Sequence, residues 1–319
     1  MHNEHFDAIV LGAGPAGLTA AIYLSRARIK TLVLNQGTVG GQMILTHEVA
    51  NYPGVEHVSG YALANTMKKQ AKEFGAVLKT VRTIDDIALS ADKKTVNVNG
   101  DTAYTADVVI LTPGGRSRTL GVPGENRFKG HGISYCATCD GEFFTGKEIV
   151  VVGGGNSALE EAVSLTKYAT KVTIVHQFNH FQGFQHAIDE ALNHPKIEVM
   201  TETVVNEFSG DERLEGVMLR NLKTNEVKPF ATDGVFVFIG YQANTEGLNG
   251  VVELNKWNEI VVDANMQTSV EGVFAAGDAI AKRFRQITTA VGDATTAALA
   301  ASAWLHERKR EGKQAFANS

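Results

Sequence analysis

Short runs of apolar residues recur along the chain, and glycine-rich turns and helix-like segments follow two of them. Residues 7–11 (DAIVL) and 148–152 (EIVVV) have the composition of strands buried on both faces of a parallel sheet. Their turns lead into segments with helical spacing at 18–24 and 159–165. A further run at 272–278 (GVFAAGD) precedes a long Ala/Thr-rich stretch. This alternation predicts an α/β fold with parallel sheets.

The two glycine turns have the spacing of dinucleotide-binding turns. Residues 12–17 read GAGPAG and residues 153–158 read GGGNSA, in which alanine is an accepted last residue. The first glycine permits the tight turn, the second lets a pyrophosphate approach the backbone, and the third lets the helix pack on the sheet. In both units the second strand ends 23 residues after the first glycine, at Asn35 and His176. We therefore predict two Rossmann-like units, although the second turn also fits a packing role without a ligand.

Length and composition narrow the class of protein. A chain of 319 residues exceeds what one hydrophobic core usually serves, so about two domains are expected. A net charge of −5 offers no general basic surface for nucleic acid. No apolar run reaches the ~18 residues of a membrane helix, and the N-terminus does not resemble a signal peptide. We expect a cytoplasmic protein that binds neither nucleic acid nor membrane.

The only two cysteines, Cys136 and Cys139, are two residues apart, and Asp140 follows them directly. Thiols at this spacing can close a small disulfide ring, and a helix opening over residues 140–144 would stabilise a thiolate. A structural zinc site needs further ligands at matching spacing, and no second cysteine pair exists. The pattern favours a redox pair over two buried structural thiols. No metal site is expected from His176, His180 and His186.

Taken together, these motifs resemble those of the low-molecular-weight thioredoxin reductases of bacteria, over essentially the whole chain. The matching segments are GAGPAG at 12–17, GGQM at 40–43, NYPG at 51–54, CATCD at 136–140, GGGNSALEEA at 153–162, GVFAAGDA at 272–279 and Arg285-Gln286. The resemblance implies two Rossmann-like domains of the three-layer ββα type. An FAD domain of residues 1–115 and 246–319 would carry an inserted pyridine-nucleotide-type domain, 116–245. It also implies a homodimer.

The same resemblance implies which residues contact the cofactor. The helix that begins near Gln286 would direct its N-terminal dipole at the flavin and favour the anionic reduced ring. The implied FAD-binding residues are Gly12, Gly14, Ala16, Gly17, Asn35, Gln36, Gln42, Asn51, Gly277, Asp278, Arg285, Gln286 and Ile287.

The resemblance also implies roles for the redox residues. A reduced flavin would give two electrons to the disulfide, with Cys139 as the sulfur on the flavin side and Cys136 attacking the disulfide of thioredoxin or a similar protein. Thiol exchange needs a thiolate nucleophile and a protonated leaving group, so Asp140 is the expected proton donor and acceptor. The alternative for Asp140 is an N-cap of the following helix.

One segment departs from the family pattern. Where NADPH-dependent members have His-Arg-Arg and a further arginine, this chain has Gln177, Phe178 and Gln182. A 2′-phosphate is recognised by guanidinium groups, and neither glutamine nor phenylalanine supplies that charge. An NADH enzyme would carry Asp or Glu near position 176, which is His176. The segment suits neither nicotinamide cofactor well.

The pattern without arginines resembles that of ferredoxin-dependent flavin thioredoxin reductases. Reduced ferredoxin is therefore the leading donor, and the basic residues Lys282, Arg283 and Arg285 are a candidate docking patch for such an acidic protein. The alternatives are a reductase that uses NADH or NADPH through other contacts, an FAD dithiol oxidase that passes electrons to oxygen, and a non-catalytic flavoprotein.

Two aromatic features complete the expectations. Phe178, Phe181 and Phe184 recur at every third position, as in a packing face or a plug over the vacated nucleotide pocket. The C-terminal helix is expected to end near Gly312. The tail beyond it is either a disordered, solvated end or a segment whose Phe316 covers the flavin of its own chain or of a dimer partner.

Overall fold

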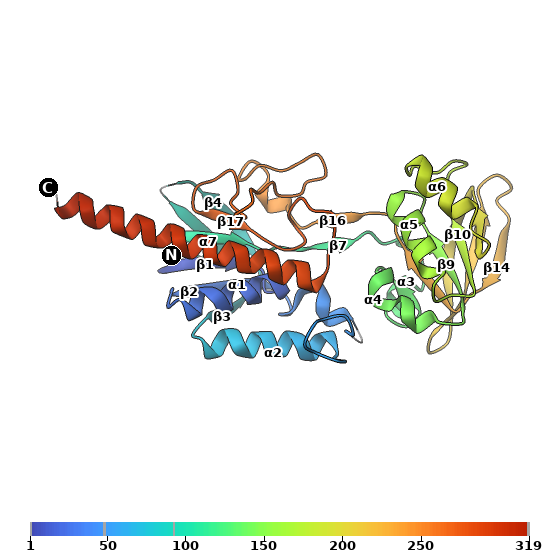
Figure 1. Cartoon of the computed structure of the whole chain (residues 1–319), viewed down its shortest axis with the longest axis horizontal. Helices are drawn as coiled ribbons and strands as arrows, with labels where there is room; N and C mark the ends of the chain where they lie inside the picture. The colour runs from blue at the N-terminus through green and yellow to red at the C-terminus, as the bar shows by residue number, and fades with distance from the viewer. Residues whose placement is uncertain (1, 47–48, 92, 318–319) are drawn as a thin grey trace. The chain divides into compact units, whose positions relative to one another are not determined.

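The structure is a computed structural model that describes residues 2–46, 49–91 and 93–317. The chain divides into two compact units. Unit 1 comprises Met1–Arg116 and Gln242–Ser319, and unit 2 comprises Ser117–Tyr241. Two short strands, β7 (Gly115–Ser117) and β16 (Tyr241–Ala243), pair with each other where the chain passes between the units (Figure 1).

Unit 1 contains a seven-stranded sheet. Its strands are β1 (His2–Leu11), β2 (Thr31–Gln36), β3 (Val77–Val81), β4 (Ile84–Leu89), β5 (Lys94–Val98), β6 (Thr102–Leu111) and β17 (Val273–Ala275). The order is β3-β2-β1-β6-β5-β4, and β17 pairs with the end of β6. β1, β2, β3, β6 and β17 are parallel, whereas β4 and β5 form an antiparallel extension of β6.

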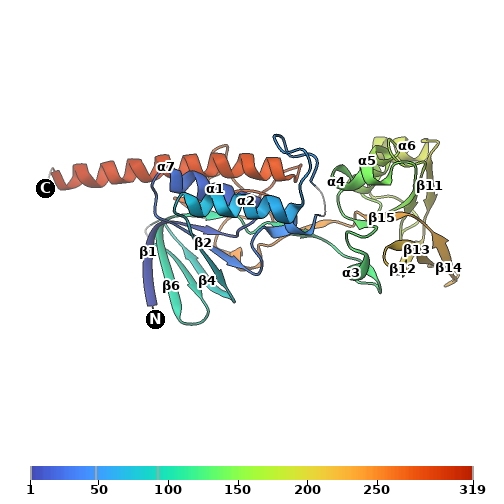
Figure 2. The ribbon, with the colours of Figure 1, turned by 90° about the horizontal axis from the view of Figure 1, so that it is seen from below.

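Helices cover one face of the parallel strands in unit 1 (Figure 2). They are α1 (Pro15–Arg26), α2 (Gly60–Glu73) and α7 (Ile287–Ala317), and the unit also has the 3₁₀ turns η1 (Gly41–Leu45) and η3 (Glu246–Leu248). Proline at the first position of α1 suits that place because its missing N–H would be unpaired there in any case. The helix interface is made of small side chains, which let α1 and α7 pack closely: Ala20, Ala21, Ala294, Ala297 and Ala301 are all buried.

Unit 2 has a five-stranded parallel sheet of order β11-β10-β9-β15-β8. These strands are β8 (Ile133–Ser134), β9 (Glu148–Val152), β10 (Lys171–Val175), β11 (Ile197–Met200) and β15 (Gly234–Val237). A separate antiparallel sheet contains β12 (Thr203–Gly210), β13 (Leu214–Asn221) and β14 (Val227–Ala231). The helical segments are α3 (Glu125–Phe128), α4 (Ala137–Asp140), η2 (Gly141–Phe144), α5 (Asn156–Leu165) and α6 (Gln185–Leu192).

The α/β fold with two Rossmann-like units is confirmed. In each unit a buried parallel strand, a glycine turn and a helix follow one another as the apolar pattern predicts. Within the described ranges, no helix combines the length and apolarity needed to cross a membrane.

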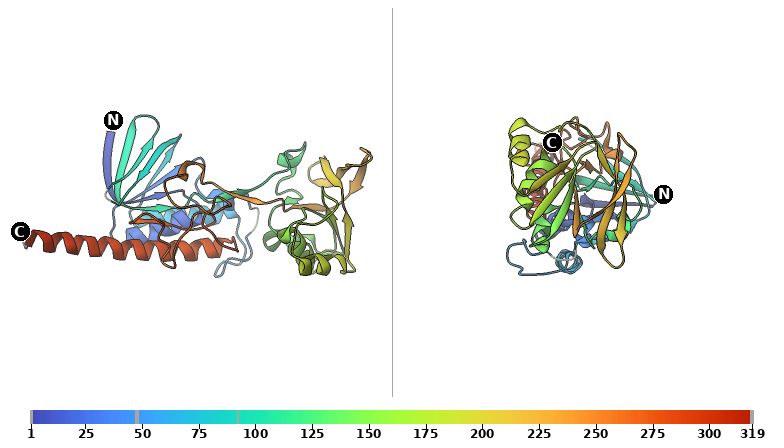
Figure 3. Two further views of the ribbon diagram at one scale, coloured as in Figure 1. Left: turned by 90° about the horizontal axis from the view of Figure 1, so that it is seen from above. Right: turned by 90° about the vertical axis from the view of Figure 1, so that its right-hand side faces the viewer.

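The expectation for the C-terminus is wrong in one respect. α7 continues through Gly312 to Ala317, because a single glycine inside a helix costs only about 1 kcal/mol. At ~1.5 Å per residue the 31 residues of α7 span about 45 Å, and Figure 3 shows α7 in red running past the rest of unit 1. Phe316 therefore cannot reach the start of α7 in its own chain. Its side chain, Asn318 and Ser319 lie outside the described residues.

The close packing of the glycine turn in unit 1 can be tested by a glycine-to-alanine substitution, which adds one methyl group. A Cβ on Gly17 would lie 1.8 Å from the Gly12 carbonyl oxygen, so Gly17→Ala should lower the free energy of unfolding by about 3 kcal/mol. Gly292→Ala is the control, because the added Cβ meets nothing within 4 Å and alanine favours the helix by up to about 1 kcal/mol. Urea unfolding followed by the fluorescence of Trp257 and Trp304, both in unit 1, measures the difference. Equal stability of the two variants would contradict the close packing.

Candidate functional site

The redox pair forms a disulfide in unit 2. Cys136 and Cys139 are bonded, with 5.3 Å between their Cα atoms, and Cys139 belongs to α4. Cys136 follows β8 at the N-cap of α4, and its Sγ accepts a hydrogen bond of 3.2 Å from the Cys139 N–H. The helix expected over residues 140–144 is instead one α turn ending at Asp140, followed by the 3₁₀ turn η2.

Asp140 is half-buried next to the disulfide, and its partner is a serine. Ser134 Oγ lies 2.5 Å from Asp140 Oδ2. Asp140 occupies the N-cap position of η2, as the alternative predicts, but its side chain makes no capping hydrogen bond there. Burial raises the pKa of Asp140, and the hydrogen bond from Ser134 partly offsets this. A carboxyl with a raised pKa can hold and release a proton nearer neutral pH.

Sequence reasoning missed Ser134. It lies two residues before Cys136 at the end of a two-residue strand, and it carries no pattern of its own. Its contact with Asp140 exists only in the folded chain, where the loop brings the two residues together. A serine close to a C-x-x-C pair and a carboxylate is the only signal that the sequence offered.

The glycines at 12–17 differ in their surroundings. Gly12 has φ +108°, and a Cβ there would lie 2.1 Å from the Thr112 carbonyl oxygen. Gly17 likewise packs against the backbone of Gly12. Gly14 is different, because a Cβ on it would meet only the Gly41 Cα, at 3.9 Å. The first and third glycines therefore serve packing, while the second leaves the backbone open to a ligand.

Asn35 and Gln36 lie at the carboxyl end of β2, next to this turn. Asn35 Oδ1 accepts a hydrogen bond of 3.0 Å from the Ala13 N–H, and its Nδ2 donates to the Gly37 carbonyl at 3.0 Å. Asn35 thus fixes the glycine turn itself. Gln36 is exposed and donates weakly to the Arg82 carbonyl, at 3.4 Å.

Asp278 follows β17 and has one oxygen without a hydrogen bond. Gly277, at φ +83°, packs on Ala16, where a Cβ would come within 2.8 Å of the alanine side chain. Asp278 Oδ1 is buried and, within the described residues, has no hydrogen-bond partner; Lys282 Nζ is 3.6 Å away. Burial raises the pKa of Asp278, and the charges of Lys282 and Arg285 act in the opposite direction. A buried acceptor of this kind fits a ligand hydroxyl.

The remaining expected residues of unit 1 gather around the start of α7. Asn51 Nδ2 donates to Gln286 Oε1 at 3.4 Å, although 235 residues separate the two in the chain. Arg285 Nε donates to the Asp278 carbonyl at 3.3 Å, and Ile287 packs against the core. Gln42 is exposed in η1.

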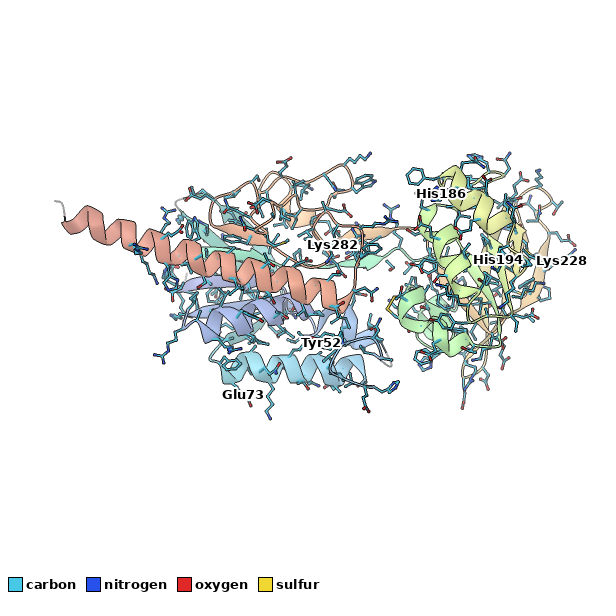
Figure 4. All side chains as sticks on the ribbon, in the orientation of Figure 1. Tyr52, Glu73, His186, His194, Lys228 and Lys282 are labelled. Atoms are coloured by element: carbon cyan, nitrogen blue, oxygen red, sulfur yellow. A yellow bond between two sulfur atoms is a disulfide. The ribbon has the colours of Figure 1, made fainter. Side chains whose placement is uncertain are left out.

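The basic segment at 282–285 is not a free docking patch. Lys282 is only 13% exposed, and its Nζ lies 2.6 Å from Asp293 Oδ2 (Figure 4 marks Lys282). The Arg285 guanidinium forms an ion pair with Glu259. Two of the three cations are thus committed to carboxylates within unit 1. The expectation that they form an exposed basic surface is wrong.

The second glycine turn is covered by the loop that follows β10. His176 is buried, and a Cβ on Gly154 would lie 2.2 Å from its ring. The loop closes over the turn through hydrogen bonds from the Gln182 N–H to the Gly154 carbonyl, at 2.8 Å, and from the Phe184 N–H to Asn156 Oδ1, at 2.6 Å. Burial lowers the pKa of His176, so the imidazole tends to be neutral.

The three phenylalanines of this loop do not form one face. Phe181 stacks on His176 and packs against the core of unit 2. Phe178 and Phe184 are 40% and 66% exposed. Gln177 and Gln182 are exposed as well. The described residues contain no group of three His, Cys, Asp or Glu side chains that could hold a metal ion.

Comparisons with known proteins agree with this geometry. The family model described as pyridine nucleotide-disulphide oxidoreductase matches residues 6–294. The chain is 42% identical to the 34.2 kDa protein in rubredoxin operon of Clostridium pasteurianum, over 95% of this chain and 98% of that protein. It is 41% identical to thioredoxin reductase of Bacillus subtilis, over 95% of each chain.

A solved structure shows the same fold. Thioredoxin reductase from Streptococcus pyogenes superimposes with a TM-score of 0.91 at 38% identity, and the match covers 95% of this chain and 99% of that one. The chain therefore belongs to the pyridine nucleotide-disulphide oxidoreductase family, as a thioredoxin reductase-like enzyme.

Proposed function

We propose that the chain is an FAD-dependent disulfide oxidoreductase that reduces thioredoxin or a thioredoxin-like protein, with reduced ferredoxin rather than NADPH as the electron donor. The observation that carries the proposal is the Cys136–Cys139 disulfide beside the protonatable Asp140 in a family of disulfide oxidoreductases. We place the enzyme in the cytoplasm as a homodimer. Residues 1–115 and 246–319 form its FAD domain, and residues 116–245 form the inserted domain.

The residues of unit 1 fit FAD. Gly14 leaves room for a pyrophosphate at the N-terminus of α1, where the backbone N–H groups and the helix dipole favour an anion. The unsatisfied Asp278 Oδ1 suits a ribityl hydroxyl. When bound, FAD supplies two-electron chemistry that side chains lack. The residues proposed to hold it are Gly12, Gly14, Ala16, Gly17, Asn35, Gln36, Gln42, Asn51, Gly277, Asp278, Arg285, Gln286 and Ile287.

The chain's own residues account for disulfide exchange. In the dithiol state, the Cys136 thiolate attacks the substrate disulfide and forms a mixed disulfide, while the departing substrate sulfur takes a proton from Asp140. Cys139 then attacks Cys136 Sγ, which restores the internal disulfide and releases the second substrate sulfur as a thiolate, which takes a proton from water. Asp140 returns to its protonated state by accepting the proton of the attacking thiol.

The loop over the second glycine turn supports a donor other than NADPH. Residues 176–184 contain no Arg, Lys, Asp or Glu, so they offer neither a guanidinium for a 2′-phosphate nor a carboxylate for ribose hydroxyls. The same loop makes hydrogen bonds to the turn itself. NAD(P)H use through other contacts and an oxygen-using dithiol oxidase are the competing outcomes of the donor test.

The cofactor assignment predicts one FAD per chain in the purified protein. Asp278→Asn preserves size but removes the charged acceptor, and should weaken FAD binding by roughly 10- to 100-fold, the value of a charge-assisted hydrogen bond. Asp101→Asn is the control, an exposed carboxylate of the same unit. Fluorescence titration of FAD-depleted protein measures the affinity. Equal affinities in the two variants would show that Asp278 does not hold the cofactor.

The cysteine assignment predicts that both sulfurs are essential for reducing thioredoxin and neither for binding FAD. Cys136→Ser should leave a single thiol at position 139 and block attack on the substrate. Cys139→Ser should stop at a mixed disulfide that the lost sulfur cannot resolve. Mass spectrometry after mixing with oxidised thioredoxin detects this trapped adduct. Wild-type turnover by either variant would rule out the assigned roles.

The donor assignment predicts fast anaerobic reduction of the flavin by reduced ferredoxin, and slow reduction by NADPH and NADH. Stopped-flow absorbance in the flavin band measures all three. Gln177→Arg, Phe178→Arg and Gln182→Arg in one variant should improve NADPH use at least 10-fold by supplying guanidinium groups. NADH, which lacks the 2′-phosphate, is the matched control and should gain little. A wild-type Michaelis constant for NADPH in the low micromolar range would refute the donor proposal.

A further inference from the structure

The Ser134 hydroxyl lies where three polar groups of the redox loop meet. Ser134 is the last residue of β8 and is 4% exposed. Its Oγ accepts a hydrogen bond of 3.1 Å from the Cys136 N–H. The same oxygen lies 2.5 Å from Asp140 Oδ2 and 3.2 Å from the Cys136 carbonyl oxygen. One buried hydroxyl therefore contacts the carboxyl group and both backbone polar groups of the first cysteine.

The number of protons on these groups limits which hydrogen bonds they can form at the same time. A serine hydroxyl donates one hydrogen bond and accepts up to two. The Cys136 N–H occupies one acceptor position, so the Ser134 proton can go to Asp140 or to the Cys136 carbonyl. An ionised Asp140 is an acceptor only, and Ser134 must donate to it. A protonated Asp140 can donate a hydrogen bond to Ser134 Oγ. The serine O–H is then free to donate its own hydrogen bond to the Cys136 carbonyl.

We propose that Ser134 is a positioning residue that reverses its hydrogen bond with Asp140 whenever that carboxyl gains or loses a proton. Both states leave every polar group of the cluster paired, because the Cys136 carbonyl also accepts a hydrogen bond of 3.2 Å from the Asp140 N–H. An unpaired buried group would be costly. Asp140 exchanges its proton without moving away from the disulfide loop. The inference rests on the proposed function, in which Asp140 carries protons for thiol exchange.

Among the residues that the structure describes, no charged side chain adds to the two causes that shift the pKa of Asp140. α4 packs on η2 and α5, whose titratable side chains are Glu142, Glu160 and Glu161, and the Tyr168 ring lies against Gly141. The shift in the pKa of Asp140 has two causes, burial and the Ser134 hydrogen bond. Burial raises the pKa and the hydrogen bond lowers it, so removing the hydroxyl should raise the pKa further.

A carboxyl ¹³C NMR titration of the FAD-bound, disulfide form tests the inference without any substrate. The Asp140 resonance is identified by its absence in Asp140→Asn. Ser134→Ala should raise the titration midpoint by about one pH unit, and Ser134→Thr, which keeps the hydroxyl, should restore it. Thr232→Val, which removes another buried hydroxyl of unit 2, is the control and should leave the midpoint unchanged. An unchanged midpoint in Ser134→Ala would overturn the proposal.

A second measurement tests the inference without substituting Ser134. The ¹³C resonance of the Cys136 carbonyl should titrate with the same midpoint as Asp140, because the serine O–H donates its hydrogen bond to that carbonyl when Asp140 is protonated. Asp140→Asn should abolish this titration. A carbonyl resonance that does not follow Asp140 would contradict the reversal even if Ser134→Ala fails to fold.

A kinetic arm separates this inference from the proposed function. The protein is reduced with dithiothreitol, desalted, and mixed with oxidised thioredoxin at a series of pH values. Ser134→Ala should shift the Asp140-dependent limb of the rate profile upward by the same unit. If wild-type protein does not reduce thioredoxin at all, the proposed function fails, and the two NMR titrations still decide the role of Ser134.

Discussion

The close approach of backbone to backbone at the ends of the parallel strands determines where the glycine turns of this chain can lie. In unit 1, the Gly12 carbonyl oxygen and the Thr112 carbonyl oxygen occupy the space that side chains on Gly17 and Gly12 would need. α1 can begin directly beside the sheet only because both positions lack a Cβ. Asn35 and Gly277 then reach the same edge from β2 and β17. Ligand-binding geometry is thus a consequence of packing.

Each unit contains a partly buried carboxylate, Asp278 in unit 1 and Asp140 in unit 2, and the two have different partners. Asp140 has a neutral partner, the Ser134 hydroxyl, so no cation offsets the effect of burial, which raises its pKa and favours the protonated form. Asp278 has cations nearby, Lys282 and Arg285, which oppose its protonation and suit a permanent acceptor. Similar burial therefore favours proton transfer in unit 2 and a fixed binding contact in unit 1.

Much of the fold could be predicted because it depends on local pattern. The apolar runs at 7–11 and 148–152, with glycines directly after them, specify strand, turn and helix within about 20 residues. The contact between Asn51 and Gln286 depends on the whole sheet being assembled, and the pairing of Lys282 with Asp293 depends on how α7 begins. A run of basic residues suggests an exposed basic surface when the carboxylates that pair with it in the fold are distant in the sequence.

The second glycine turn shows that packing alone can require the glycines of a nucleotide-binding motif. Gly153 has φ +144°, and a Cβ there would lie 2.4 Å from the Phe238 carbonyl oxygen. Gly154 lies against the ring of His176. These contacts demand glycine whether or not a nucleotide binds. Guanidinium groups that read a 2′-phosphate would serve the ligand alone, and the positions for them, 177, 178 and 182, are exposed and hold no cation. The residues at 177, 178 and 182 therefore bear on the identity of the electron donor, whereas the glycines of the turn bear only on the fold.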